Sequence, residues 1–133
     1  MIRISKKVEY ALMALKFISK SGERVVTARE ISDSTHIPYD LLSKILQKLK
    51  NEKILASNQG TYGGYSLNKR PEEIPLLYVM NVLDGETAIT ECMNENHDTE
   101  CCHTDSCSIK SPIIQLQKEF EDLFRNKKIS DFV

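Results

Sequence analysis

Two short amphipathic helical segments in tandem, followed at once by a glycine-rich hairpin, constrain the fold of this chain most. The first begins with a capping box, in which the Thr27 hydroxyl can accept from the backbone amide of Glu30 while the Glu30 side chain reaches back. Pro38 suits the first turn of the second helix. The buried stripe of that helix is formed by Leu42, Ile45, Leu46 and Leu49. A short polar turn over residues 32–36 separates the two, which is the outline of a helix-turn-helix.

Two strand-like pieces around a glycine-rich loop follow the second helix. The candidate strands are residues 54–57 and 65–67, and Tyr62, Gly63 and Gly64 lie in the loop between them. A hairpin placed directly after a recognition helix is a wing. The glycine pair permits positive φ and a close backbone approach, for which a phosphate backbone or minor groove is the natural candidate. The alternative is that the glycines only make the turn.

Three other helices are expected around this unit. The first covers residues from about 5 to 20, and another lies between Pro75 and Gly85. Ser111 and Pro112 provide the cap and first turn of the last one, which has a long apolar stripe. The stripe contains Ile113, Leu116, Phe120 and Leu123. It has to be buried against the same helix of a partner in a two-fold dimer, or against the chain's own first helix.

The predicted fold class is therefore mainly α. A winged helix-turn-helix DNA-binding domain, with its small hairpin wing, is expected over residues 1–85. Residues 86–133 are expected to hold a cysteine-containing loop and a long C-terminal dimerisation helix.

Charge is divided unevenly along the chain. Residues 1–70 carry thirteen Lys and Arg against six Asp and Glu, whereas residues 71–133 carry five against thirteen. A basic first half suggests a polyanionic partner. The longest apolar run near the start, residues 11–15, is far too short for a membrane span or a signal-peptide core, so a cytoplasmic protein is expected.

The residues near the start of a recognition helix read base edges, while phosphate contacts fix its register. The candidates in the second helix are Pro38, Tyr39, Asp40, Ser43, Lys44 and Lys48. The wing adds Tyr62, Gly63 and Gly64. No nucleophile and base pair or phosphate-cradling loop presents itself, so an enzyme is not expected.

All four cysteines lie within sixteen positions, at Cys92, Cys101, Cys102 and Cys107. No C-x-x-C pair occurs, which weakens a zinc interpretation. Three thiolates on a flexible loop can instead hold three corners of an iron–sulfur cluster. A fourth ligand is then needed, and a histidine or acid of the loop or a residue of a partner subunit could supply it.

These residues and motifs resemble the winged-helix transcription regulators grouped with IscR, NsrR and RirA. The resemblance rests on "ISKKVEYALMAL", "ISDSTHIPYDLLSKILQKLKNEKIL", "GTYGGYSL", "VMNVLDG" and the cysteine loop before a C-terminal helix. It covers nearly the whole chain, and "GTYGGYSL" is its most specific motif.

The resemblance implies a homodimer that binds a palindromic operator in double-stranded DNA and holds a 2Fe-2S or 4Fe-4S cluster near the dimer interface. It implies Cys92, Cys101 and Cys107 as cluster ligands, and Glu9 of the other subunit as the fourth. Cys102 is an extra cysteine that could replace Cys101 or act as its redox partner. The gap from Cys92 to Cys101 is longer than the family's usual spacing.

The leading hypothesis is a homodimeric transcription regulator, of the repressor type, that senses redox state, nitric oxide or iron–sulfur status through this cluster. A second hypothesis replaces the cluster with thiol and disulfide chemistry among the four cysteines. A third is a winged-helix interaction module that does not bind DNA.

Overall fold

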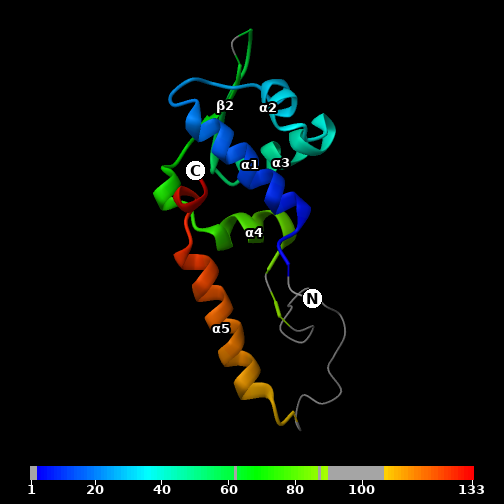
Figure 1. The fold of residues 1–133 in the computed structure, drawn as a ribbon, viewed down its shortest axis with the longest axis vertical. Coiled ribbons are helices and arrows are strands. Elements are labelled where there is room, and N and C mark those ends of the chain that lie inside the picture. Colours follow the sequence, from blue (N-terminus) through cyan, green and yellow to red (C-terminus); the bar gives the residue numbers. More distant parts are fainter. Residues whose placement is uncertain (1–2, 62, 87, 90–106) are drawn as a thin grey trace.

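The computed structural model describes residues 3–61, 63–86, 88–89 and 107–133. Its helices are α1 (Lys6–Lys20), α2 (Ala28–Thr35), α3 (Tyr39–Asn51), α4 (Leu76–Asp84) and α5 (Lys110–Asn126), with the 3-10 turns η1 (Pro71–Glu73) and η3 (Ile129–Phe132). The strands β1 (Leu55–Asn58) and β2 (Gly64–Leu67) form an antiparallel hairpin. We call α1 to α4, the hairpin and residues 127–133 the head. The hairpin projects from one end of the head, and α5 extends from the other (Figure 1).

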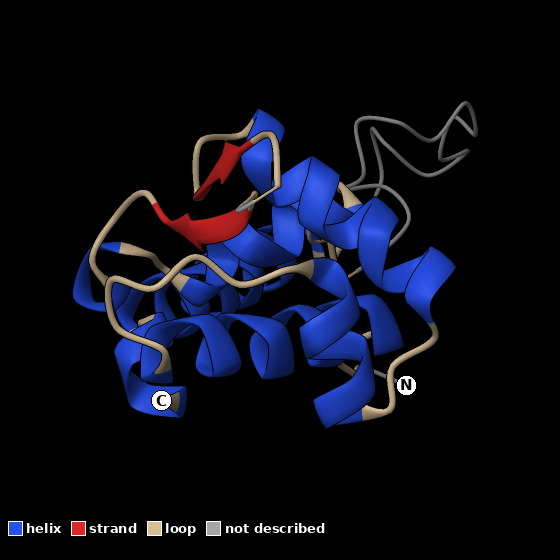
Figure 2. Cartoon of the chain, turned by 90° about the horizontal axis from the view of Figure 1, so that it is seen from above, coloured by secondary structure: helices blue, strands red, loops and turns tan. Residues whose placement is uncertain are grey.

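The winged helix-turn-helix fold is confirmed, with helices making up most of the described chain around the two short strands (Figure 2). α1 follows Ser5, whose hydroxyl accepts from the backbone amide of Val8. α4 follows Pro75 and ends at Gly85, as expected. Among the helices that the structure describes, none combines the length and apolar character needed to cross a bilayer.

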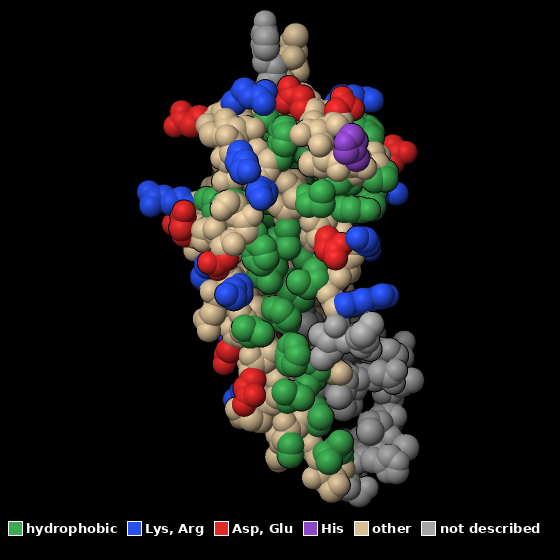
Figure 3. All heavy atoms as spheres, viewed as in Figure 1, with side chains coloured by type: hydrophobic (Ala, Val, Ile, Leu, Met, Phe, Trp, Pro, Cys, Tyr) green, Lys and Arg blue, Asp and Glu red, His purple; other side chains and the backbone are tan. Residues whose placement is uncertain are grey.

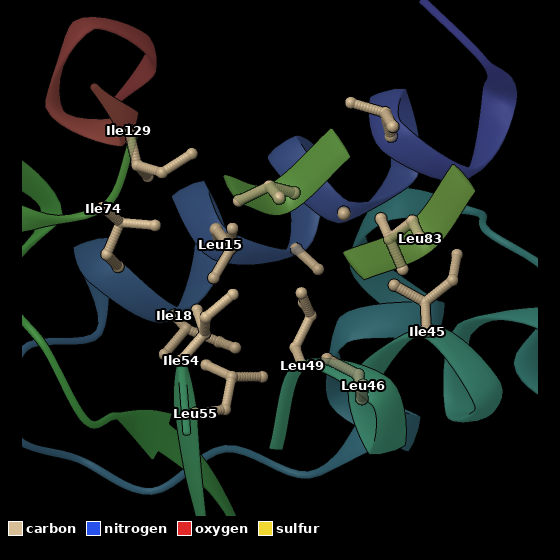
Figure 4. Close-up of a cluster of buried hydrophobic side chains, with 14 of the residues drawn as sticks. Leu15, Ile18, Ile45, Leu46, Leu49, Ile54, Leu55, Ile74, Leu83 and Ile129 are labelled. Carbon is tan, nitrogen blue, oxygen red and sulfur yellow. The ribbon is translucent and has the colours of Figure 1, made fainter. Parts of the chain in front are cut away.

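The core of the head is apolar, and it is shared by α1, α3, α4 and the end of the chain (Figure 4). Leu15 and Ile18 of α1 meet Leu49 of α3 there, all with no exposed surface. No polar or charged residue is buried within the described ranges. Burial of apolar surface, rather than a buried polar network, therefore holds the helices in place.

The position predicted for the turn at 32–36 is wrong, because α2 continues to Thr35. The hydroxyls of its last turn are satisfied by carbonyls: Ser32 Oγ donates to the Ile37 carbonyl at 2.7 Å, and Thr35 Oγ1 donates one turn back at 2.6 Å. His36 then ends the helix with a left-handed φ of 61°. Serine and threonine favour turns on average, but hydroxyls bonded in this way are compatible with a helix end.

α5 begins slightly before the predicted cap at Ser111. Ile109 is the N-cap, and Pro112 is the third helical residue. Proline is tolerated there because the first N–H groups of a helix have no acceptor within the helix.

The chain returns to the head after α5. The Leu76 amide donates to the Lys127 carbonyl at 2.8 Å, and the Ile129 amide donates to the Ile74 carbonyl at 2.9 Å. Ile129 is fully buried. The last seven residues therefore belong structurally with the head, whereas α5 itself packs against α4.

Candidate nucleic-acid interface

α3 has one buried side and one exposed side. The buried side consists of the predicted stripe Leu42, Ile45, Leu46 and Leu49, none of them more than 2% exposed. The other side consists of Tyr39, Asp40, Ser43 and Lys44, with Lys48 at its margin and Pro38 at its start. Ser43 is half-buried, and the other five are exposed. The structure thus brings the predicted residues of this helix onto one surface.

A capping box fixes the start of α2, and so the approach to α3. The Glu30 amide donates to Thr27 Oγ1 at 3.1 Å, and the Thr27 amide donates to Glu30 Oε2 at 3.3 Å. The same carboxylate pairs with Arg24 at 3.3 Å. Reciprocal caps of this kind satisfy two backbone donors that would otherwise lack partners.

The hairpin is attached to the segment that precedes α2. Val26 and Tyr65 exchange backbone hydrogen bonds, with N–O distances of 2.9 and 2.6 Å. A side chain at Gly64, where φ is 149°, would collide with the Val26 carbonyl, and one at Gly63 would collide with the Asn58 carbonyl. Packing within the chain therefore explains both glycines. Their contact with DNA stays a prediction, and Tyr62 lies outside the described residues.

A polar cleft of about 360 Å³ separates α3 from the hairpin. Its walls consist of Gln47, Lys50 and Asn51 of α3 and Ser57, Asn58, Gln59, Gly64 and Tyr65 of the hairpin region. The lining has one ammonium group, four side-chain amides and two hydroxyl groups, but no carboxylate. Such a lining offers hydrogen-bond donors to an anion without an opposing negative charge.

Two tyrosines lie near each other on this surface. Burial raises the pKa of Tyr65 above 10.0, and the nearby phenol of Tyr39 raises it further. Both causes disfavour the phenolate, so Tyr65 stays a neutral hydrogen-bond donor near pH 7. The Arg29 guanidinium of α2 lies 4.6 Å from the centroid of the Tyr39 ring.

Three cysteines of the predicted cluster site, Cys92, Cys101 and Cys102, lie outside the described residues. Cys107 is a half-buried free thiol just before α5. Glu9 is exposed in the first turn of α1, where its carboxylate accepts from Lys6 Nζ at 2.7 Å and thereby raises the pKa of Lys6.

The two described members of the predicted cluster site belong to separate parts of the chain. α1 belongs to the head, whereas the beginning of α5 lies at the far end of the molecule (Figure 1). Across the part of the chain that is described, no three His, Cys, Asp or Glu side chains converge.

Sequence reasoning missed several residues of this surface. Arg29 was not singled out, because nothing in α2 alone points toward Tyr39. The sequence places Gln47 on the polar outer face of the helix, but it was not assigned to the DNA interface. Asn51 could have been found, since it continues that face four residues after Gln47. The hairpin contribution to the cleft depends on how the two elements pack, which spacing does not give.

Comparison with known proteins gives a consistent result. The sequence pattern of the Rrf2 family, described as iron-dependent transcriptional regulators, matches residues 4–133. A helix-turn-helix transcriptional regulator of Aquifex aeolicus is 26% identical over 129 residues, which cover 97% of this chain and 90% of that protein.

Two solved structures share the fold. CymR, the global cysteine regulator of B. subtilis, superimposes with a TM-score of 0.77 at 21% identity, covering 98% of this chain and 95% of CymR. IscR of T. potens gives a TM-score of 0.73 at 21% identity, covering 98% of this chain and 85% of IscR.

Proposed function

This chain belongs to the Rrf2 family of transcriptional regulators, and from that premise we propose that it binds a palindromic operator in double-stranded DNA as a homodimer. The observation that carries the proposal is the exposed face of α3 beside the hairpin. That face is anchored by a buried apolar stripe and presents Tyr39, Ser43 and Lys44 outward. A helix so held can enter the major groove as a rigid unit.

The polar cleft supports the same proposal. When α3 lies in the major groove and the hairpin reaches the minor groove, the phosphate strand that separates the two grooves has to pass between them. The cleft occupies that position, and its Lys50 and amide groups suit a phosphodiester. Contacts of this kind set affinity and register, while α3 reads the base edges.

We assign the dimer contact to α5. None of its residues is buried, although Ile109 before it and Leu116 and Leu123 within it are large, apolar and 42–59% exposed. With Ile113 and Phe120 they recur at alternating spacings of four and three, the repeat of a coiled-coil seam. A hydrophobic band continues from the head along this helix (Figure 3). A second copy of the same helix can cover such a seam by two-fold symmetry.

We propose that an iron–sulfur cluster is the sensing group, held by Cys92, Cys101 and Cys107 with Glu9 of the partner subunit. Cys107, the described cysteine of this set, fits because it is a free and partly accessible thiol. When bound, such a cluster would change its charge and its ligands on oxidation or nitrosylation. Glu9 could bind a cluster only if its salt bridge with Lys6 breaks. That salt bridge is exposed to solvent and therefore weak.

A cluster-free thiol switch is the second candidate. The observation that favours it is the same free Cys107 thiol, with Cys101 and Cys102 within six positions of it in the chain. In this version oxidation would join two of the cysteines, or form a sulfenate on one of them.

Anaerobic purification separates the two sensing chemistries. The cluster predicts a coloured protein with matching iron and acid-labile sulfide, and loss of both in Cys92→Ala and Cys107→Ala. A colourless, iron-free protein with four titratable thiols would establish the thiol switch instead. Glu9→Ala is expected to weaken cluster retention without changing the fold, and a normal cluster in that variant would remove Glu9 from the ligand set.

DNA binding is tested separately, by measuring affinity for promoter fragments of the native genome at several salt concentrations. The proposal predicts binding that weakens steeply with salt and is lost in Lys44→Ala. Absence of binding to every fragment, with and without bound iron, would favour the interaction module.

A further inference from the structure

Arg29 and Tyr39 join the beginnings of α2 and α3. The guanidinium lies over the ring, 4.6 Å from its centroid. Both side chains are at the surface, and Tyr39 is 42% exposed. A cation stacked on an exposed ring is among the weaker contributions to folding stability, so the contact calls for another explanation.

Helix stability does not explain the placement of Arg29. Asp33 follows four residues later on α2, the spacing at which opposite charges pair along a helix. Within the described ranges, however, Arg29 forms no salt bridge, and the neighbouring Glu30 pairs with Arg24 instead. A cation in the first turn also opposes the helix dipole. The Arg29 guanidinium thus lies on the Tyr39 ring, although Asp33 is four residues away in the sequence, at the spacing of a helical salt bridge.

Tyr39 has little else to hold it. It is the first residue of α3, and the preceding Pro38 makes no side-chain cap. Among the residues that the structure describes, no hydrogen bond of the Tyr39 hydroxyl is found. Because helix ends fray, the ring would otherwise sample several rotamers.

We propose that Arg29 is a positioning residue that fixes the Tyr39 ring for base reading, so that the pair determines specificity at one base pair of each half-site. This inference rests on the proposed DNA binding through α3. With the guanidinium on one face, the ring keeps its other face and its hydroxyl for a base edge. A thymine methyl suits the apolar ring face, and a purine acceptor suits the hydroxyl.

The chemistry of arginine makes this role specific. A guanidinium is planar and stacks on aromatic rings while its N–H donors remain free at its edge. A lysine ammonium carries the same charge but neither the plane nor the fork. Arg29→Lys therefore separates positioning from charge.

The experiment uses the full-length protein and the DNA sequence that the wild type prefers, together with variants of that DNA changed at each base pair in turn. Affinities are measured for wild type, Arg29→Lys, Tyr39→Leu and the double variant at several salt concentrations. Arg29→Lys should keep the salt slope but lose at least about fivefold in discrimination at one base pair. Tyr39→Leu should lose discrimination at that same base pair, and the double variant should lose no more than Tyr39→Leu alone.

Lys69→Met is the matched control. It removes another cation over a tyrosine, at 5.5 Å from the Tyr78 ring, in a contact that includes no residue of α3. Base discrimination should be unchanged in this variant, and circular dichroism should show all variants folded.

Three outcomes would overturn the inference. Full discrimination in Arg29→Lys would make Arg29 a simple phosphate contact, and losses in Arg29→Lys and Tyr39→Leu at different base pairs would separate the two residues. In both cases the wild type still binds DNA, so the proposed function survives. A wild type that binds no DNA would overturn the proposed function, and this inference with it.

Discussion

The head and α5 differ in the burial of their apolar residues. In the head, α1, α3 and α4 each bury four or more side chains in one shared core. α5 is the longest helix described, at 17 residues, yet it buries none. α5 packs against α4, and its Phe124 is partly buried against the core of the head, but Leu116 and Leu123 are exposed to solvent.

A single chain therefore buries the apolar side chains of the head in one core, but not those of α5. The head buries most of its apolar side chains in one core, as a domain that folds alone must, and leaves only Met13, Phe132 and Val133 of its described large aliphatic and phenyl side chains 37–42% exposed. α5 leaves a stripe of large apolar side chains exposed, and this stripe is the contact that we propose for a second copy. Stability should therefore depend on the head, and assembly on α5.

The largest expected effect comes from opening a cavity in the head. Leu46 of α3 is fully buried, so Leu46→Ala should lower the free energy of unfolding by about 2–5 kcal/mol. Urea unfolding measures the change. The exposed counterpart Leu116→Ala should show a loss that disappears on dilution, because it acts only through self-association. A loss independent of protein concentration in Leu116→Ala would show that Leu116 stabilises the single chain.

Charges placed on the α5 seam should separate assembly from folding. Leu116→Asp and Leu123→Asp should each weaken self-association by about 100-fold, because a carboxylate would be buried in the contact. Analytical ultracentrifugation gives the dissociation constants. Lys118→Asp, on the opposite side of the same helix, is the matched control and should stay dimeric. Equal effects of all three substitutions would show that the seam is not the contact.

A smaller effect on the free energy of unfolding is expected at the contact between α4 and the residue that follows α3. The Tyr78 hydroxyl donates to the Glu52 carbonyl at 3.1 Å and to Glu52 Oε2 at 3.3 Å. Tyr78→Phe should cost about 0.5–1 kcal/mol of stability, since these bonds are exposed to solvent.

The pH dependence of that difference has a definite sign. Partial burial first, and then the charge and hydrogen bond of Glu52, raise the pKa of Tyr78 above 10.0. A group whose pKa is higher in the folded state contributes stability that is complete below the unfolded pKa and is lost as pH rises through the folded one. The gap between wild type and Tyr78→Phe should therefore be constant near pH 8 and shrink above pH 10. A gap that widens there would contradict the hydrogen-bond assignment.

The smallest effect is a gain in stability. Lys53, which follows α3, has a left-handed φ of 61°, a conformation that costs a residue with a side chain more than glycine. Lys53→Gly should stabilise the head by about 0.5–1 kcal/mol in thermal unfolding and leave self-association unchanged. Destabilisation would show that contacts of the lysine side chain outweigh the backbone strain.

Helical periodicity predicted the head well because each helix buries one continuous stripe. The spacing of Val8, Ala11, Leu12 and Leu15 predicts one buried face of α1. All four lie on that face, where Leu12 is half-buried and the other three are fully buried. The turn predicted at residues 32–36 was wrong, because the turn propensity of serine and threonine does not show which carbonyls the hydroxyls of Ser32 and Thr35 will bond. The return of Ile129 to the core was also missed, since a single apolar residue near the end of a chain forms no pattern.

The candidate interface was predictable only where it lies on one helix. Tyr39, Ser43 and Lys44 share a face by spacing alone. The Arg29 contact and the cleft wall at Ser57 join different elements, so they depend on how α2, α3 and the hairpin pack.

Selection of binding sites from random-sequence DNA by the purified, anaerobic protein tests whether the chain reads DNA as a two-fold dimer. In the proposed dimer, two copies joined at α5 would place two α3 helices around a two-fold axis. The enriched DNA should therefore be an inverted repeat, with half-site centres separated by about 34 Å, one helical turn, or a multiple of it. Enrichment of a single unrepeated site, or no enrichment at all, would contradict a dimeric DNA-binding regulator.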